Sequence, residues 1–424
     1  MAQHAPVLAP PGADLLRLST AGSVDDGKST LIGRLLYETR EVFDDQLAAV
    51  ERASRARGAD YVDLALLTDG LRAEREQGIT IDVAYRHFAT AHRRFILADT
   101  PGHVQYTRNM VTGTSTADVT VVLLDARKGA TEQTHRHLYV AAMLRVPRVI
   151  VCVNKLDLVG FDEVSFLAIQ RELTAFAARL GLPTPHFIPI SALLGDNVVR
   201  RSGAMAWYDG PTLLEDLEQV PAAADRRGGP ARLPVQWVVR PHRREHHDYR
   251  GYAGQLASGE LRVGDLVIVQ PAGLTTRVAG IDTFDGPLES ASAPASVVVQ
   301  LRDQLDVARG DLIGSADMPA SVGQELDVLT CWFSTTPLRV GGRYLVKHTT
   351  RTTRALVQRL DHAVDVNTGD ALPADTLNLN DIGVLRLKTL APLAYDAYAV
   401  DRSMGSLILI DEASNETLAA GVIS

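Results

Sequence analysis

The first half of the chain alternates short apolar runs with segments in which apolar residues recur at helical spacing. The apolar runs include "LLRLSTA", "RRFILAD", "DVTVVLLDA", "RVIVCVNKLD" and "HFIPISA", all between residues 15 and 192. Between them lie "KSTLIGRLLYETR", "EQTHRHLYVAAMLR" and "VSFLAIQRELTAFAARLG", which have a period of about 3.6 residues. Buried strands that alternate with helices predict crossover units and a mostly parallel sheet with helices on both faces.

The pattern changes after "RRGGP" at residues 226–230. Segments such as "LPVQWVVR", "TRVAGIDTF" and "ASVVVQLRD" are short, often alternating and punctuated by Gly and Asp, which predicts an all-β domain closed as a barrel or sandwich. A break at residues 314–324 precedes a second set of this kind. We therefore predict a flexible tail at residues 1–14, an α/β domain at 15–225, and two β-barrel-type domains at 230–315 and 322–424.

Composition narrows the class of protein. The 424 residues are 46% hydrophobic and 22% charged, and the net charge of -8 argues against a broad non-specific nucleic-acid surface. Cys152 and Cys331 lie in apolar runs and are expected to be buried, reduced thiols. The N-terminus lacks the features of a signal peptide, and no apolar run reaches the roughly 18 residues of a membrane span. We expect a cytoplasmic protein without a nucleic-acid or membrane partner.

The stretch "GSVDDGKST" at residues 22–30 lies between a predicted strand and a predicted helix. Gly22 and Gly27 allow the backbone to turn so that consecutive N–H groups point at phosphate oxygens, and the following helix offers its positive N-terminus. Lys28 can reach the β- and γ-phosphates, and Ser29 can supply a hydroxyl ligand to Mg²⁺. This segment is a candidate phosphate loop.

Three further segments follow strands in the order that a nucleotide site requires. In "LADTPGH", Asp99 ends a strand run and can hold Mg²⁺, while Gly102 can offer its N–H to a γ-phosphate. In "NKLD", Asp157 can accept hydrogen bonds from guanine N1–H and the 2-amino group, and adenine cannot donate these bonds. Asn154 can bond the purine and neighbouring loops, and the Lys155 stem can lie along the base.

The third segment, "ISALLGDN" at residues 190–197, completes the predicted base site. Ser191 is predicted to brace Asp157, and the Ala192 N–H to donate to guanine O6. Four such segments in one order predict binding of GTP with Mg²⁺.

These motifs resemble those of translation-factor-type GTPases, which implies an α/β P-loop GTPase domain followed by two all-β barrel-type domains. "EREQGITID" resembles the first switch segment of that group and implies Thr80 as a Mg²⁺ ligand beside Ser29 and Asp99. "DTPGH" resembles the second switch and implies His103 as the residue that positions water, flanked by Val24. His103, Lys28 and Thr80 are thus the implied catalytic residues.

The motif segments together give one predicted nucleotide-binding set. Its members are Gly22, Ser23, Val24, Asp25, Asp26, Gly27, Lys28, Ser29, Thr30, Asp99, Thr100, Pro101, Gly102, His103, Asn154, Lys155, Asp157, Ser191, Ala192 and Leu193.

Longer stretches closely resemble the family of GTP-binding large subunits of bacterial sulfate adenylyltransferase. They include "GSVDDGKSTLIGRLLYET", "ADTPGHVQYTRNMVTGTSTAD", "LLDARKG" and "DYRGYAGQLASGELRVGD". Asp26 stands where translation factors proper usually have His. The resemblance runs from about residue 15 to the C-terminus.

This resemblance implies a partner and a reaction. In that family, a small catalytic subunit joins ATP and sulfate to give adenosine 5′-phosphosulfate (APS) and pyrophosphate, and GTP hydrolysis by the large subunit drives this step in a heterodimer or a higher assembly. Some relatives carry a fused adenylylsulfate kinase. No second phosphate-loop pattern occurs in the sequence, so we expect no such kinase domain.

Two other hypotheses for the function stay open. The protein could be a translation-factor-like GTPase that carries a charged tRNA, or a nucleotide-binding scaffold that does not hydrolyse GTP. Arg72 or Arg75 could act as an arginine finger, although a solvated helix face is the commoner role. The His-rich "RPHRREHHDYRG", with His242 four residues before His246, is a weak metal candidate. A partner-facing or anion-attracting loop is a second role, and a solvated surface loop is the commonest.

Overall fold

The structure is a computed structural model that describes residues 14–39, 44–56, 62, 64–67, 82–221, 228–241 and 249–424. These residues divide into two compact units. One lies within Met1–Ala223 and Asp365–Asp370, and the other within Ala224–Val364 and Ala371–Ser424. The exact domain limits given above remain predictions.

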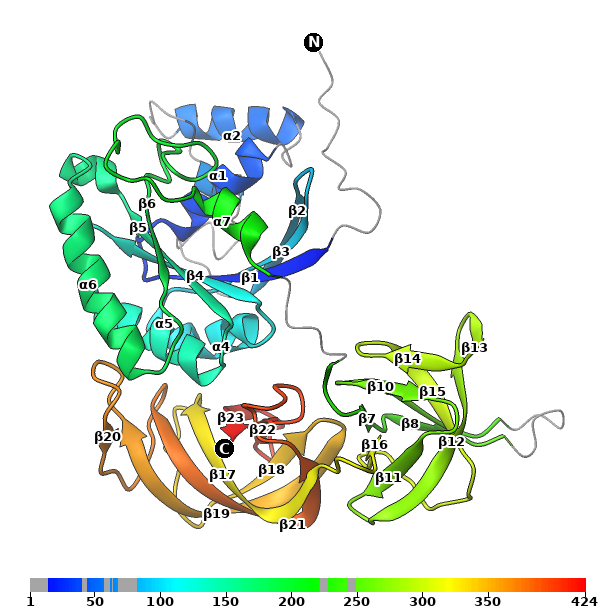
Figure 1. Cartoon of the computed structure of the whole chain (residues 1–424). Helices are drawn as coiled ribbons and strands as arrows, with labels where there is room; N and C mark the ends of the chain where they lie inside the picture. Colours follow the sequence, from blue (N-terminus) through cyan, green and yellow to red (C-terminus); the bar gives the residue numbers. More distant parts are fainter. Residues whose placement is uncertain are drawn as a thin grey trace. The chain divides into compact units, whose positions relative to one another are not determined.

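A twisted sheet forms the centre of the first unit (Figure 1), with the strand order β2-β3-β1-β4-β5-β6. The strands are β1 (Leu15–Ala21), β2 (Ala84–Ala89), β3 (Arg94–Asp99), β4 (Val119–Asp125), β5 (Arg148–Asn154) and β6 (His186–Pro189). β2 runs antiparallel to β3, and the other neighbours are parallel. The predicted, mostly parallel sheet is confirmed.

Helices cover both faces of this sheet (Figure 1). They are α1 (Lys28–Glu38), α2 (Asp44–Ala56), α4 (Thr107–Ser115), α5 (Glu132–Met143), α6 (Glu163–Arg179) and α7 (Leu213–Gln219), with the short 3-10 turns η1 (Leu64–Leu67), η2 (Val104–Tyr106) and η3 (Leu156–Val159). α1 and α7 share one apolar cluster with alternate residues of the strands, whereas α4 and α5 pack on β1, β3 and β4 from the other face. Every residue of β4 is buried, as expected for a central strand with helices on both sides.

The second unit is all-β and has two separate apolar clusters, one from residues between Ala231 and Ile313 and the other from residues between Leu326 and Ile423. The strands around the first cluster are β7 (Arg232–Pro234), β8 (Trp237–Val239), β9 (Gly251–Gln255), β10 (Glu260–Arg262), β11 (Leu266–Gln270), β12 (Leu274–Thr283), β13 (Gly286–Leu288), β14 (Ser290–Ser292), β15 (Ser296–Leu301) and β16 (Leu312–Ser315). Their main sheet has the order β7-β16-β11-β12-β15-β9-β8. The segment "LPVQWVVR" forms two short strands because β7 pairs with β16 while β8 pairs with β9.

The strands around the second cluster are β17 (Ser321–Trp332), β18 (Arg343–His348), β19 (Arg351–Val364), β20 (Ala371–Leu372), β21 (Ile382–Tyr395), β22 (Ser406–Ile410) and β23 (Thr417–Ile423). Their order is β18-β22-β23-β17-β21-β19-β20, and an additional β18–β19 pairing closes the sheet into a barrel. Closure gives each strand of the barrel two neighbours, whereas the two-residue β20 pairs with β19 at the rim. The predicted fold class, an α/β GTPase-type domain followed by β-barrel domains, is confirmed.

Ion pairs join the two barrels within the second unit. Arg232, only 2% exposed, donates to both carboxylate oxygens of Asp396 at 2.7 and 3.1 Å and to Met318 O at 2.9 Å. Arg351 pairs with Asp311 at 3.0 Å. Around them, Leu312, Ala320, Ala394 and Met404 form a small apolar cluster.

Both cysteines are buried, as predicted. Within the part of the chain that the structure describes, no helix is both long enough and apolar enough to cross a bilayer.

Candidate functional site

The candidate phosphate loop, residues 22–30, follows β1 and includes the first turn of α1. Gly27 precedes the helix with φ +94°, and a Cβ atom there would lie 2.4 Å from Asn154 Nδ2, so both conformation and space require glycine. α1 has no side-chain cap at its N-terminus and no acidic residue in its first turn. Its first N–H groups therefore favour an anion at this end of the helix.

Buried charges organise this loop. The Asp26 carboxylate accepts a hydrogen bond from the Ser23 N–H at 2.7 Å, and Lys28 Nζ donates to Gly22 O at 2.9 Å. Burial raises the pKa of the Asp26 carboxyl, against the lowering effect of the Ser23 hydrogen bond. Burial also lowers the pKa of the Lys28 ammonium, and Asp99 and Asp26 offset part of this effect. A phosphate beside Lys28 would stabilise its charged form.

The second motif follows β3 and lies directly against the phosphate loop. Thr20 pairs with Asp99 across β1 and β3, and the Thr100 hydroxyl donates to Thr20 O at 2.5 Å. A Cβ atom at Gly102 would lie 2.3 Å from Gly22 O and 2.6 Å from Lys28 Nζ. Only glycine allows this backbone to pass so close to the lysine that is predicted to bind the γ-phosphate.

His103 is exposed at the start of the segment that leads to α4. Its Nδ1 accepts a hydrogen bond from the Gln105 N–H at 3.2 Å, and its ring centre lies 6.1 Å from that of Tyr106. Because Nδ1 is the acceptor, Nε2 carries the proton in the neutral ring. Nε2 could therefore donate to a water molecule, which is compatible with the predicted role of His103.

The third and fourth motifs meet at Asn154, the last residue of β5. Asn154 Nδ2 donates to Asp26 O at 2.7 Å, and Asn154 Oδ1 accepts from the Ala192 N–H at 2.9 Å. One buried amide thus joins the phosphate loop to the loop that is predicted to bind guanine. The Ala192 N–H, predicted to donate to O6, has this amide oxygen as its partner. The Ser191 hydroxyl accepts from the Leu194 N–H at 3.2 Å, and its predicted contact with Asp157 remains a prediction.

Asp125 belongs to this site and is absent from the predicted set. It ends β4, opposite Asn154 of β5, and its carboxylate accepts from Lys155 Nζ at 3.1 Å and from Arg127 Nη2 at 2.6 Å. Burial opposes ionisation of Asp125, but the hydrogen bonds from Arg127 and Lys155 hold its pKa well below the usual range. Asp125 therefore fixes the lysine of "NKLD". The acid at the end of the strand run in "LLDARKG" was the signal that could have found it.

We predict that Asp125→Asn weakens GDP binding about tenfold, the effect of losing one charge-assisted bond that holds Lys155. Fluorescence titration measures the affinity, and exposed Asp285→Asn is the control. Equal GDP affinity in wild type and both variants would remove Asp125 from the site.

The same carboxylate is expected to make the stability of the fold depend on pH. Because the pKa of Asp125 is lower in the folded than in the unfolded chain, its carboxylate stabilises the fold above about pH 4, and this contribution is lost as the pH falls further. The stability difference between wild type and Asp125→Asn should therefore shrink below that pH.

Thr80 of the predicted site lies outside the described residues. So do the weaker candidates Arg72, Arg75, His242 and His246. Among the residues that are described, no cluster of three or more His, Cys, Asp or Glu side chains could hold a metal ion. Ser29 and Asp99 offer a hydroxyl and a carboxylate, the hard oxygen donors that Mg²⁺ takes together with phosphate oxygens and water.

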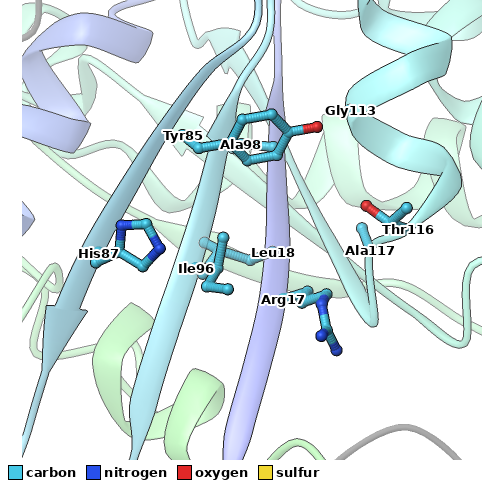
Figure 2. Close-up of a pocket in the computed structure, with 9 residues that line it drawn as sticks. All are labelled: Arg17, Leu18, Tyr85, His87, Ile96, Ala98, Gly113, Thr116 and Ala117. Carbon is cyan, nitrogen blue, oxygen red and sulfur yellow. The ribbon is translucent and has the colours of Figure 1, made fainter. Parts of the chain in front are cut away.

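A hollow of about 320 Å³ lies elsewhere, on the face of the sheet beside α4 (Figure 2). Its lining residues are Arg17, Leu18, Tyr85, His87, Ile96, Ala98, Gly113, Thr116 and Ala117. Figure 2 shows side chains of β1, β2 and β3 around it, with Tyr85 near Ala98 and His87 near Ile96. None of these residues belongs to the predicted nucleotide-binding set, whose members follow the carboxyl ends of the strands, where ligands bind in sheets of this type.

Comparison with known proteins gives the family. Residues 13–223 match the family described as Elongation factor Tu GTP binding domain, and residues 325–424 match GTP-eEF1A C-terminal domain-like. Sulfate adenylyltransferase subunit 1 of Methylorubrum populi is 50% identical over 412 residues, which cover 97% of this chain and 87% of that protein. The chain belongs to the sulfate adenylyltransferase subunit 1 family.

Other members of the family and related enzymes agree. Sulfate adenylyltransferase subunit 1 of Aeromonas hydrophila is 48% identical, over 96% of this chain and 86% of that protein. The bifunctional enzyme CysN/CysC of Mycobacterium tuberculosis is 54% identical, over 96% of this chain and 67% of that enzyme. The crystal structure of sup35 complexed with GDP aligns at 23% identity over 97% of this chain and 94% of that one, with a TM-score of 0.44.

Proposed function

We propose that this chain is the GTPase subunit of a sulfate adenylyltransferase. In this proposal, its hydrolysis of GTP drives formation of APS and pyrophosphate from ATP and sulfate by a small catalytic partner subunit. Membership in the subunit 1 family carries the proposal. The geometry supports it, because Asn154 holds the phosphate loop and the predicted guanine loop in one continuous site.

In the proposed reaction, a water oxygen attacks the γ-phosphorus of GTP in line with the departing GDP, which leaves with the bonding electron pair. Lys28 and the N–H groups of residues 22–30 stabilise the charge on the phosphate oxygens, and the Gly102 N–H meets the γ-phosphate. Ser29 and Asp99, with Thr80, would hold Mg²⁺, which would supply positive charge against the phosphate groups. His103 orients the water, whose proton passes to phosphate or solvent.

We predict that His103→Ala lowers kcat for GTP hydrolysis about a hundredfold and changes GTP affinity less than threefold, because a residue that orients water acts mainly in the transition state. Single-turnover hydrolysis and equilibrium binding measure the two quantities. His92→Ala removes an exposed histidine from the turn between β2 and β3 and is the matched control. Unchanged turnover in His103→Ala would remove His103 from the mechanism.

A translation-factor role is the competing function, and the same GTPase assay separates the two. We expect hydrolysis to rise when the small subunit, ATP and sulfate are added together, and to stay unchanged when ribosomes and charged tRNA are added. Stimulation by ribosomes alone would overturn the proposal.

A further inference from the structure

Arg34 extends from α1 to the loop at residues 191–195. It lies six residues after Lys28, and its guanidinium spans two successive carbonyl groups of that loop. Arg34 Nε donates to Ala192 O at 3.2 Å, and Nη2 donates to Leu193 O. The side chain is 17% exposed, so most of the guanidinium is held between the helix and the loop.

Glu38, one helical turn further along α1, supports the same contact. Its Oε1 lies 3.6 Å from Arg34 Nη1, and its side chain is only 14% exposed. Gly195 has φ +90°, and a Cβ atom there would lie 2.7 Å from Glu38 Oε1. Burial raises the pKa of Glu38, and the Arg34 guanidinium acts against this rise. The backbone of the loop therefore packs directly on a pair of side chains from α1.

On its solvent-facing side, the 191–195 loop buries few side chains that would hold it in place. The side chains of Leu193 and Leu194 are exposed, at 37% and 60%, so they bury little surface that would hold it. Inside the loop, the Gly195 N–H donates to Ser191 O at 2.7 Å, and on the inner side the Ala192 N–H meets Asn154 Oδ1. Arg34 thus donates a hydrogen bond to the carbonyl of Ala192, the residue whose N–H is predicted to recognise guanine.

We propose that Arg34 is a positioning residue for guanine recognition, which fixes the 191–195 loop to the helix that begins at the phosphate loop. This inference rests on the proposed function, because it requires that the site binds a guanine nucleotide. The guanidinium fixes the peptide groups that follow Ala192 and so limits the positions that the loop backbone can take. The Ala192 N–H, which bonds Asn154 Oδ1 in this structure, reaches O6 in this proposal only when the loop is held in place beside the base. The planar guanidinium of arginine can donate to two neighbouring carbonyl oxygens at once, whereas a lysine ammonium can bond only one of them well.

A base-selective loss of affinity distinguishes this role from general support of the fold. GDP has O6, whereas 2-aminopurine riboside diphosphate carries the same ribose, phosphates and 2-amino group but lacks both O6 and the N1–H. It therefore binds more weakly in every variant, and the test compares the factor by which each substitution changes each ligand. If Arg34 acts through the Ala192 N–H, its loss weakens only the ligand that uses this contact. If Arg34 only stabilises the domain, both ligands weaken by the same factor.

The test is equilibrium titration of both diphosphates against the full chain as wild type, Arg34→Ala, Arg34→Lys and Arg171→Ala, which removes an exposed arginine of α6. We expect Arg34→Ala to weaken GDP about tenfold, the effect of one impaired hydrogen bond, and to change 2-aminopurine riboside diphosphate less than twofold. Arg34→Lys should recover part of the loss, and Arg171→Ala should match wild type.

Equal losses for the two ligands in Arg34→Lys, or no loss for GDP in Arg34→Ala, would overturn the role of Arg34. Arg34→Lys keeps the test decisive if Arg34→Ala does not fold. Wild-type titration with GDP and ADP is the separate check on the proposed function. A wild type that prefers ADP would refute guanine binding itself, whatever the variants do.

Discussion

Asp157→Asn is expected to change the nucleotide preference of the chain from guanine to xanthine. Asp157 lies half-buried in η3, two residues after Lys155 and three after Asn154, whose amide bonds the candidate phosphate loop. A carboxylate can accept from both N1–H and the 2-amino group of guanine, whereas an asparagine can accept from N1–H and donate to the 2-oxo group of xanthine. The variant should therefore lose a bond to guanine and regain it with xanthine.

The expected size of this change follows from the one bond to guanine, from the 2-amino group, that the variant loses. A loss of about 1–3 kcal/mol weakens GDP about tenfold to a hundredfold, and XDP should become the preferred ligand. Titration with GDP and XDP measures the exchange. Asp209→Asn, at an exposed position in the same domain, is the control and should keep the guanine preference. Loss of both ligands in Asp157→Asn would count against base recognition by Asp157.

Asp396→Ala is expected to lower the stability of the second unit by about 3–5 kcal/mol, because it leaves the buried Arg232 guanidinium without its anionic partner. Asp396 is 13% exposed, and both its oxygens bond Arg232. Hydrogen exchange of peptides from β7 and β21 reports the free energy of opening on both sides of the contact.

An exposed pair in the same unit gives the matched control for Asp396→Ala. Arg359 and Asp361 lie on β19 with exposed side chains, so Asp361→Ala should cost less than about 1 kcal/mol. Asp396→Asn keeps the size and one acceptor oxygen and should fall between the two. Similar exchange in Asp396→Ala and Asp361→Ala would show that the buried pair does not stabilise the joint between the barrels.

The strands that the sequence revealed are those whose residues are nearly all apolar. β4 and β5 are buried almost throughout, and their composition alone predicts central parallel strands. β2 was missed because "AYRHFA" is an edge strand that mixes polar and apolar residues. Phe88 packs on Phe95 in the core, while Tyr85 and His87 are exposed. Its pairing with β3 is a tertiary contact that no local pattern shows.

The order of the motifs predicted that the loops of the site lie side by side, but not which side chains hold them together. Asn154 was expected to contact neighbouring loops, and it joins two of them. Asp125 required knowledge that β4 lies beside β5. Arg34 could not be found from sequence, because its partner Ala192 is 158 positions away and contributes a backbone carbonyl, which any residue type would offer.

The central claim is that GTP hydrolysis drives APS formation, and the position reached by the adenylyl-transfer reaction tests it most directly. The measurement is the ratio of APS and pyrophosphate to ATP and sulfate at the end of the reaction, in the complex of this chain with its small subunit, with GTP or with a non-hydrolysable GTP analogue. The account predicts a higher ratio with GTP than with the analogue, and loss of this difference with His103→Ala. The same final ratio with GTP and with the analogue would contradict it.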